Sequence, residues 1–185
     1  MAIKTFVSGE VLTAADTNEY LGNAGLVYVT SATIGTTVSS VTVSNAFSAT
    51  YTNYKIIVAG FGGSSSGSAA FFKLNNSTGS TYFGNLIYNL PTTSAIGGVS
   101  AINGSSNGFF VHTISTSGTM SLEAMIDSPF LAVTSNCVGN YSGRTYNGQF
   151  STHDSNAASS TGFILGSTGV ALTGGTIRVY GYRNS

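Results

Sequence analysis

Two short Gly/Ser segments match the G-x-S-x-G pattern that surrounds the nucleophilic serine of α/β-hydrolases. They are residues 63–67 and 104–108. In those enzymes the serine lies on a sharp turn between a strand and a helix, and no helical pattern follows either segment here. Because a chain rich in glycine and serine produces this pattern through composition alone, we do not expect a serine hydrolase.

Carboxylates are the next candidates for chemistry. Glycosidases use two carboxyl groups about 5–9.5 Å apart. Glu123 and Asp127 lie on one expected strand, where four residues span about 13 Å. A pair formed by either residue with Asp154 from elsewhere in the fold stays open. Otherwise we interpret these carboxylates as solvated or interface charges. We therefore do not expect the chain to be an enzyme.

Metal and thiol chemistry has few candidate ligands. His112, His153 and Cys137 are the only residues of their types, and none is paired at a ligand spacing. A single cysteine cannot form an internal disulfide. We therefore expect neither a metal nor another cofactor.

The composition indicates a protein that works in an assembly. Only 6% of the residues are charged, against about 25% in ordinary soluble domains, and the formal net charge is zero. A surface of small uncharged groups is easily desolvated against another copy. The chain has no basic run and no apolar run of 18 residues, so we expect neither nucleic-acid binding nor membrane insertion. The first residues also lack the pattern of a signal peptide.

From Leu26 onward, apolar residues alternate with other residues, as in half-buried strands. The expected strands lie near 26–30, 38–44, 54–61, 69–75, 82–90, 108–115, 119–127, 131–138, 161–166 and 175–183. Gly/Ser/Asn clusters separate them and favour turns. We predict an all-β, jelly-roll-like sandwich over residues 26–185, with a long loop at 139–160.

Residues 1–25 differ from the rest and form the expected N-terminal arm. Thr13 and Asp16 match a capping box, which predicts a helix of about two to three turns that stops near Gly22 or Gly25. A helix this short is not stable alone in water. Two interpretations stay open: the arm packs on its own β-domain, or it docks on a neighbouring protein.

Aromatic and amide residues form the candidate contact patch. Tyrosine next to asparagine can hold carbohydrate or protein surfaces by stacking and hydrogen bonding. Packing within the loop, or a contact between copies, is the other interpretation. The patch comprises Tyr141, Arg144, Tyr146, Asn147 and Gln149.

Three parts of the chain resemble virion proteins of tailed bacteriophages. Residues 6–21 resemble the opening "F-x-x-G-E-x-L-T-A-A-D-x-N-x-x-L" of proteins often labelled tail fibre or minor tail proteins. Residues 175–183 are similar to the closing "G-T-x-R-x-Y-G-x-R" strand of their β-sandwich modules, and segments 54–58 and 71–75 look like early strands of such modules. The resemblance implies a virion structural protein, commonly trimeric, with the opening segment as the attachment end. No catalytic residues come with it.

We therefore expect a phage tail fibre or tail-appendage subunit, assembled into the virion in the bacterial cytoplasm. The expected partners are further copies in a homotrimer and other virion proteins that contact residues 1–25; a host-surface glycan or protein is left open. The expected attachment residues are Phe6, Leu12, Thr13, Asp16, Asn18 and Leu21. A capsid decoration or head-fibre protein is the alternative, and a glycan-degrading enzyme is a third hypothesis.

Overall fold

The computed structural model describes residues 7–11, 13–16, 25–65, 69–89, 96–109, 112–114, 120–143 and 146–183. Their elements are α1 (Ala14–Asp16), β1 (Leu26–Thr33), β2 (Ser40–Val43), β3 (Tyr51–Gly63), β4 (Ala69–Leu74), β5 (Tyr82–Asn89), β6 (Ile96–Ser105), β7 (His112–Thr113), β8 (Met120–Asp127), β9 (Ser135–Ser142), β10 (Asn147–Asp154), β11 (Phe163–Ser167), β12 (Leu172–Thr173) and β13 (Thr176–Arg183). Within these ranges no helix is both long and apolar enough to cross a membrane.

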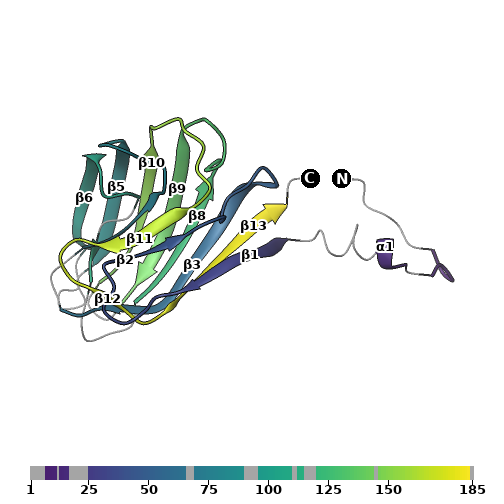
Figure 1. The fold of residues 1–185 in the computed structure, drawn as a ribbon, viewed down its shortest axis with the longest axis horizontal. Helices are drawn as coiled ribbons and strands as arrows, with labels where there is room; N and C mark the ends of the chain where they lie inside the picture. The colour runs from purple at the N-terminus through teal and green to yellow at the C-terminus, as the bar shows by residue number, and fades with distance from the viewer. Residues whose placement is uncertain are drawn as a thin grey trace.

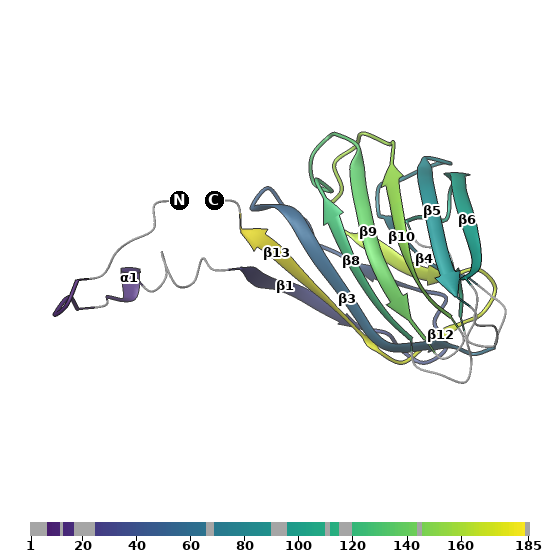
Figure 2. The same cartoon turned by 180° about the vertical axis from the view of Figure 1, so that it is seen from behind.

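Two antiparallel sheets pack face to face (Figure 1). In the described residues the large sheet has the order β1-β13-β3-β8-β9-β10-β5-β6, with β12 pairing to β3, and the small sheet has the order β2-β11-β4-β7. Figure 2 shows the large sheet from the other side, with the small sheet behind it. The expected all-β sandwich is thus confirmed, with sheets of unequal size.

Alternating side chains explain why the two sheets adhere. Along β8 the residues are alternately buried and exposed, so Met120, Leu122, Ala124 and Ile126 face the small sheet. From the small sheet, Phe72 enters the same core. Its ring centroid lies 5.1 Å from Phe109, 6.0 Å from Phe163 and 6.4 Å from Phe150. These aromatic rings join both sheets into one core.

The prediction of a long loop at 139–160 is wrong. β9 continues to Ser142, and Asn147–Asp154 form β10, which pairs with both β9 and β5. The inward positions Gly139 and Gly148 carry no apolar side chain, so the alternation is hidden in the sequence. Each glycine lies opposite an aromatic residue of the neighbouring strand, Phe150 and Tyr141 respectively, whose ring covers it.

Two further expected boundaries need correction. The segment before residue 108 was expected to be turn-rich, yet β6 occupies Ile96–Ser105 and pairs with β5 along its length. The strand expected near 108–115 is limited to His112–Thr113 in the described residues. Gly97 and Gly98 lie inside β6, although glycine has a low intrinsic propensity for strands. Pairing along β5 outweighs that preference.

Residues 7–11 and 13–16, the described part of the N-terminal arm before β1, lie apart from the sandwich in Figure 1. Helix α1 begins one residue after Thr13, as the capping box predicts, and its described part ends at Asp16. The rest of the expected helix, at residues 17–24, lies outside the described residues. β1 begins at Leu26, the residue at which the β-domain was expected to start.

Candidate functional site

The outward face of the large sheet is the candidate site. Because side chains alternate along a strand, one exposed set comes from each of β8, β9, β10 and β5. The register places Glu123, Asn140, Gln149 and Ile87 directly opposite one another on these strands. We call these four residues the cross-strand row. Neighbouring members are separated by the strand spacing of about 4.8 Å.

A second line of side chains lies beside the cross-strand row. Met125 of β8 is paired with Val138 of β9, and the next two strands contribute Ser151 and Asn85. Met125 is 44% exposed and Val138 is 50% exposed. The sheet face thus carries apolar side chains among amides and hydroxyls.

A shallow hollow of about 390 Å³ lies between these two lines of side chains. Its lining includes the whole cross-strand row and the neighbouring Met125, Val138, Ser151 and Asn85. Its volume is at the lower end of the range for small-ligand sites. The hollow is therefore large enough for part of a ligand and open enough for a ligand that extends beyond it.

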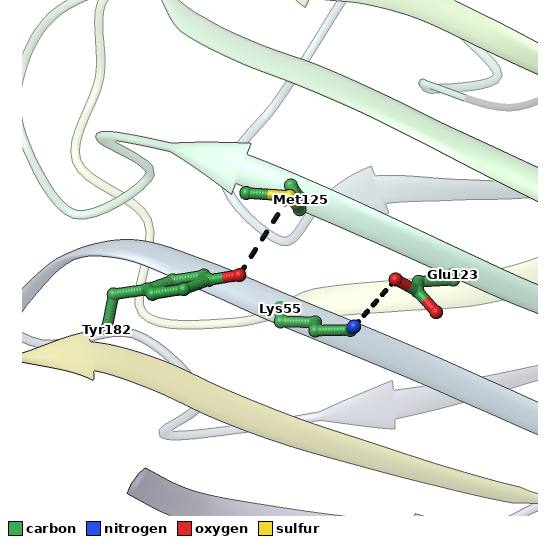
Figure 3. A network of polar contacts seen from close by, with 4 residues as sticks. All are labelled: Lys55, Glu123, Met125 and Tyr182. Carbon is green, nitrogen blue, oxygen red and sulfur yellow. Dashed lines mark hydrogen bonds and ion pairs between the residues drawn. The ribbon is translucent and has the colours of Figure 1, made fainter. Parts of the chain in front are cut away.

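An ion pair between β3 and β8 lies at the side of the hollow formed by β8. Lys55 Nζ lies 2.6 Å from Glu123 Oε1, and Tyr182 Oη donates toward Met125 Sδ at 4.0 Å (Figure 3). The hydrogen bond to Glu123 raises the pKa of Lys55 above its ordinary value of 10.5, against an opposing effect of burial. The Glu123 charge is therefore compensated from the adjacent strand β3.

Replacing Glu123 by glutamine should lower the free energy of unfolding by less than about 1 kcal/mol, because the Glu123 side chain is half exposed. Since folding raises the Lys55 pKa, the pair stabilises the protein below pH 10.5 and loses its effect as pH rises through the higher folded-state pKa. Urea unfolding of both proteins at neutral pH and well above pH 10.5 checks this. Asp127→Asn, an exposed carboxylate change on the same strand, is the control. A difference that persists after Lys55 deprotonates would contradict the assignment.

Of the expected contact patch, only part reaches this face. Gln149 is exposed and belongs to the cross-strand row. Tyr141 was expected at the surface but is 3% exposed, because it occupies an inward position of β9 and covers Gly148. Tyr146 packs edge-on against Tyr88 at the end of the sheet. Asn147 Oδ1 accepts hydrogen bonds from Ser142 Oγ and the Gly143 N–H, so it closes the β9–β10 turn.

Arg144, the remaining member of the expected patch, lies outside the described residues. Asn85, Val138 and Asn140 also line the hollow, but the sequence patterns did not identify them as site residues. Polar residues at every second position of 147–153, and at 136, 140 and 142 with Val138 between them, could have indicated two outward strand faces.

The carboxylates do not assemble into a pair across the fold. Glu123 and Asp127 face outward, as expected, but Asp154 is fully buried on the opposite side of the sheet. Its Oδ1 accepts a hydrogen bond from the Asn156 N–H at 2.9 Å. The open alternative that combined Asp154 with either outward carboxylate is therefore wrong.

The other candidate groups are also separated. His153 faces outward and stacks on Phe83, whereas Cys137 is buried and burial raises its thiol pKa. In the described part of the chain, no group of three or more His, Cys, Asp or Glu residues gathers to hold a metal. The two G-x-S-x-G segments begin at the ends of β3 and β6, and no helix follows either within the described ranges.

The opening motif forms a turn followed by the start of a helix. The Glu10 N–H donates to the Val7 carbonyl, and Glu10 Oε2 accepts from the Val7 N–H. Gly9 has φ of 89°, a backbone conformation that favours glycine. The motif glycine and glutamate therefore have local structural roles.

The expected attachment residues are only partly described. Thr13 is exposed immediately before α1, and Asp16 is the last described residue of α1. The other four, Phe6, Leu12, Asn18 and Leu21, lie outside the described residues. On the described arm, Val7 is 68% exposed and Val11 is 78% exposed.

Comparisons with known proteins found no matching family model, no matching curated protein and no matching solved structure. Function must therefore be inferred from the residues and from the geometry of the arm and the sheet face.

Proposed function

We propose that this chain is a non-enzymatic structural subunit of a tailed-bacteriophage virion, in a tail fibre or tail appendage. Residues 1–25 anchor it to other virion proteins, and the sandwich extends outward to contact the host surface. The subunit assembles with further copies as a homotrimer. The opening motif supports the virion assignment, and the sparse surface charge favours assembly.

The arm carries the anchoring part of this proposal. Val7 and Val11 are both more than two-thirds exposed, and they flank a turn held by Glu10. Burial of a valine side chain stabilises an interface by about 1.5–3 kcal/mol. The ordered turn therefore presents two apolar side chains to a partner without first having to fold.

Replacing both valines by aspartate should reduce the number of copies per particle at least about tenfold, because each change removes apolar contact and introduces a charge at the interface. Particles assembled from wild-type and mutated genes are compared by quantitative mass spectrometry. Ser8→Asp is the matched control, since it adds a charge to the same turn without removing an apolar side chain. Equal incorporation of the double variant would contradict anchoring through this turn.

Cryo-electron microscopy of the same particles tests the location. Density for the sandwich on the tail supports the proposal. Density on the capsid shell alone would overturn the tail assignment in favour of a decoration protein. Native mass spectrometry of the purified chain checks the homotrimer, and a stable monomer at micromolar concentration would contradict it.

A further inference from the structure

The hollow on the large sheet is lined by amides that are available to a ligand. Asn85, Asn140 and Gln149 are exposed, and their side chains make no hydrogen bond with another described residue. An amide offers one acceptor oxygen and two donor hydrogens. Three such groups on adjacent strands can both donate to and accept from the same molecule.

The charge around the hollow favours a neutral ligand. Glu123 is the charged residue among the described lining residues, and Lys55 compensates it at 2.6 Å. No lysine or arginine is among the described lining residues. A phosphate or another anion would therefore lack a cationic partner here. An uncharged ligand needs no such partner.

The remaining lining suits a ligand that has hydroxyl groups and apolar C–H faces. Ile87, Met125 and Val138 supply aliphatic surface beside the amides. Hydroxyl groups donate and accept, as the amides do, and sugar rings combine hydroxyls with C–H faces. The centre of a protein interface is instead typically rich in aromatic residues and poor in serine and acidic residues. The three amides and Ser151 within this lining therefore favour a saccharide over a second protein.

The sheet holds these groups at a fixed spacing. β9 and β10 pair without interruption from Ser135–Asp154 to Ser142–Asn147, and β10 continues in register with β5. The side chains of one row thus recur about every 4.8 Å across the strands, a distance comparable to the length of one pyranose ring. A linear chain of sugars lying along the cross-strand row would meet Asn140 and Gln149 at successive rings, with Asn85 beside the row on β5.

We propose that the hollow over β8, β9, β10 and β5 binds a neutral, linear oligosaccharide, with Asn85, Asn140 and Gln149 as its hydrogen-bonding residues. Ile87, Met125 and Val138 contact the C–H faces of its rings. The role of this binding in host attachment rests on the proposed function, but the binding itself is a property of the isolated chain.

The test uses the full chain labelled with ¹⁵N and titrated with short neutral hexose oligosaccharides of increasing length. Side-chain NH₂ signals of Asn85, Asn140 and Gln149 should shift together, and affinity should rise with length. Sialylated oligosaccharides of the same lengths should bind more weakly, because no lysine or arginine among the described lining residues can pair with the sialic acid carboxylate. The combined Asn140→Ala and Gln149→Ala variant should weaken binding about tenfold or more.

Asn53→Ala is the matched control, because Asn53 is an exposed amide on the same face, on β3 and outside this hollow. The affinity of this variant for the oligosaccharide should stay within about twofold of wild type. Absence of shifts at millimolar oligosaccharide, or equal weakening by Asn53→Ala, would overturn the proposal. Shifts on the same face that depend on protein concentration alone would also overturn it, in favour of a second copy. Particle incorporation is measured separately, so failure of sugar binding is distinguishable from failure of the virion assignment.

Discussion

Replacing Phe72 by alanine should lower the free energy of unfolding by about 3–5 kcal/mol. Phe72 is 1% exposed and lies among Phe109, Phe150 and Phe163. Removing its ring leaves a cavity where β4 of the small sheet meets β10 of the large sheet. Domains of this size have about 5–15 kcal/mol of total stability, so a large share of it would be lost.

Denaturant unfolding measures this loss, and thermal unfolding should show a fall of about 6–20 °C in Tm. Phe71→Ala is the matched control, because Phe71 is the same residue type on the opposite face of β4 and is only partly buried. Its ring covers Gly166 and lies near Lys73, so its loss should cost about 1 kcal/mol. Equal losses for both variants would contradict the assignment of Phe72 to the shared core.

Cys137 supplies an independent readout of the Phe72 variant. Its thiol is 1% exposed, and burial raises its pKa, so the folded protein should react slowly with thiol reagents. Labelling then requires opening of the sandwich. Phe72→Ala should accelerate labelling strongly, and Phe71→Ala should change it little.

Replacing Gly148 by alanine is the second change with a large expected effect. An added Cβ would lie 2.2 Å from the Ile87 carbonyl oxygen and 2.5 Å from Tyr141 Oη. The first contact is with main chain of β5, so β5 and β10 must separate locally. We expect a loss of about 3 kcal/mol or more in the free energy of unfolding, at the upper end of overpacking effects.

Gly35→Ala is the control, since its Cβ would meet only Val38 Cγ1 at 3.2 Å, and it should cost less than about 1 kcal/mol. Adding Tyr141→Ala to the Gly148 variant should not restore stability, because the collision with the Ile87 carbonyl remains. Denaturant unfolding of the four proteins checks both statements. A Gly148 variant as stable as wild type would show that the strands are less closely paired at this position.

Much of the large sheet was predictable where inward positions are apolar. The alternation at 120–126 predicts β8 and places Glu123 and Asp127 on the outward face, as the structure shows. The same reasoning fails for β10, because its inward Gly148 offers no apolar signal and depends on Tyr141 from the next strand. A strand whose core contact is supplied by its neighbour cannot be recognised from its own residues.

The candidate site was predictable only in part for the same reason. Gln149 was expected at a recognition surface, but as part of a loop with Tyr141. Strand pairing instead buries Tyr141 and aligns Gln149 with Asn140 and Ile87. Neither Asn140 nor Ile87 is distinctive in the sequence, because an exposed amide or aliphatic residue acquires meaning only from its neighbours across the strands.

The sequence by itself determined the all-β class, the sparse charge and the start of the helix in the arm. Alternation and capping patterns act over a few neighbouring residues, and the sparse charge follows from composition alone. Only the tertiary structure decided which strands are neighbours and which side chains share a row. Register depends on contacts between residues far apart in the chain, where a shift of one residue would exchange the buried and exposed faces. The three amides line one hollow because the observed register places them on the same face of neighbouring strands.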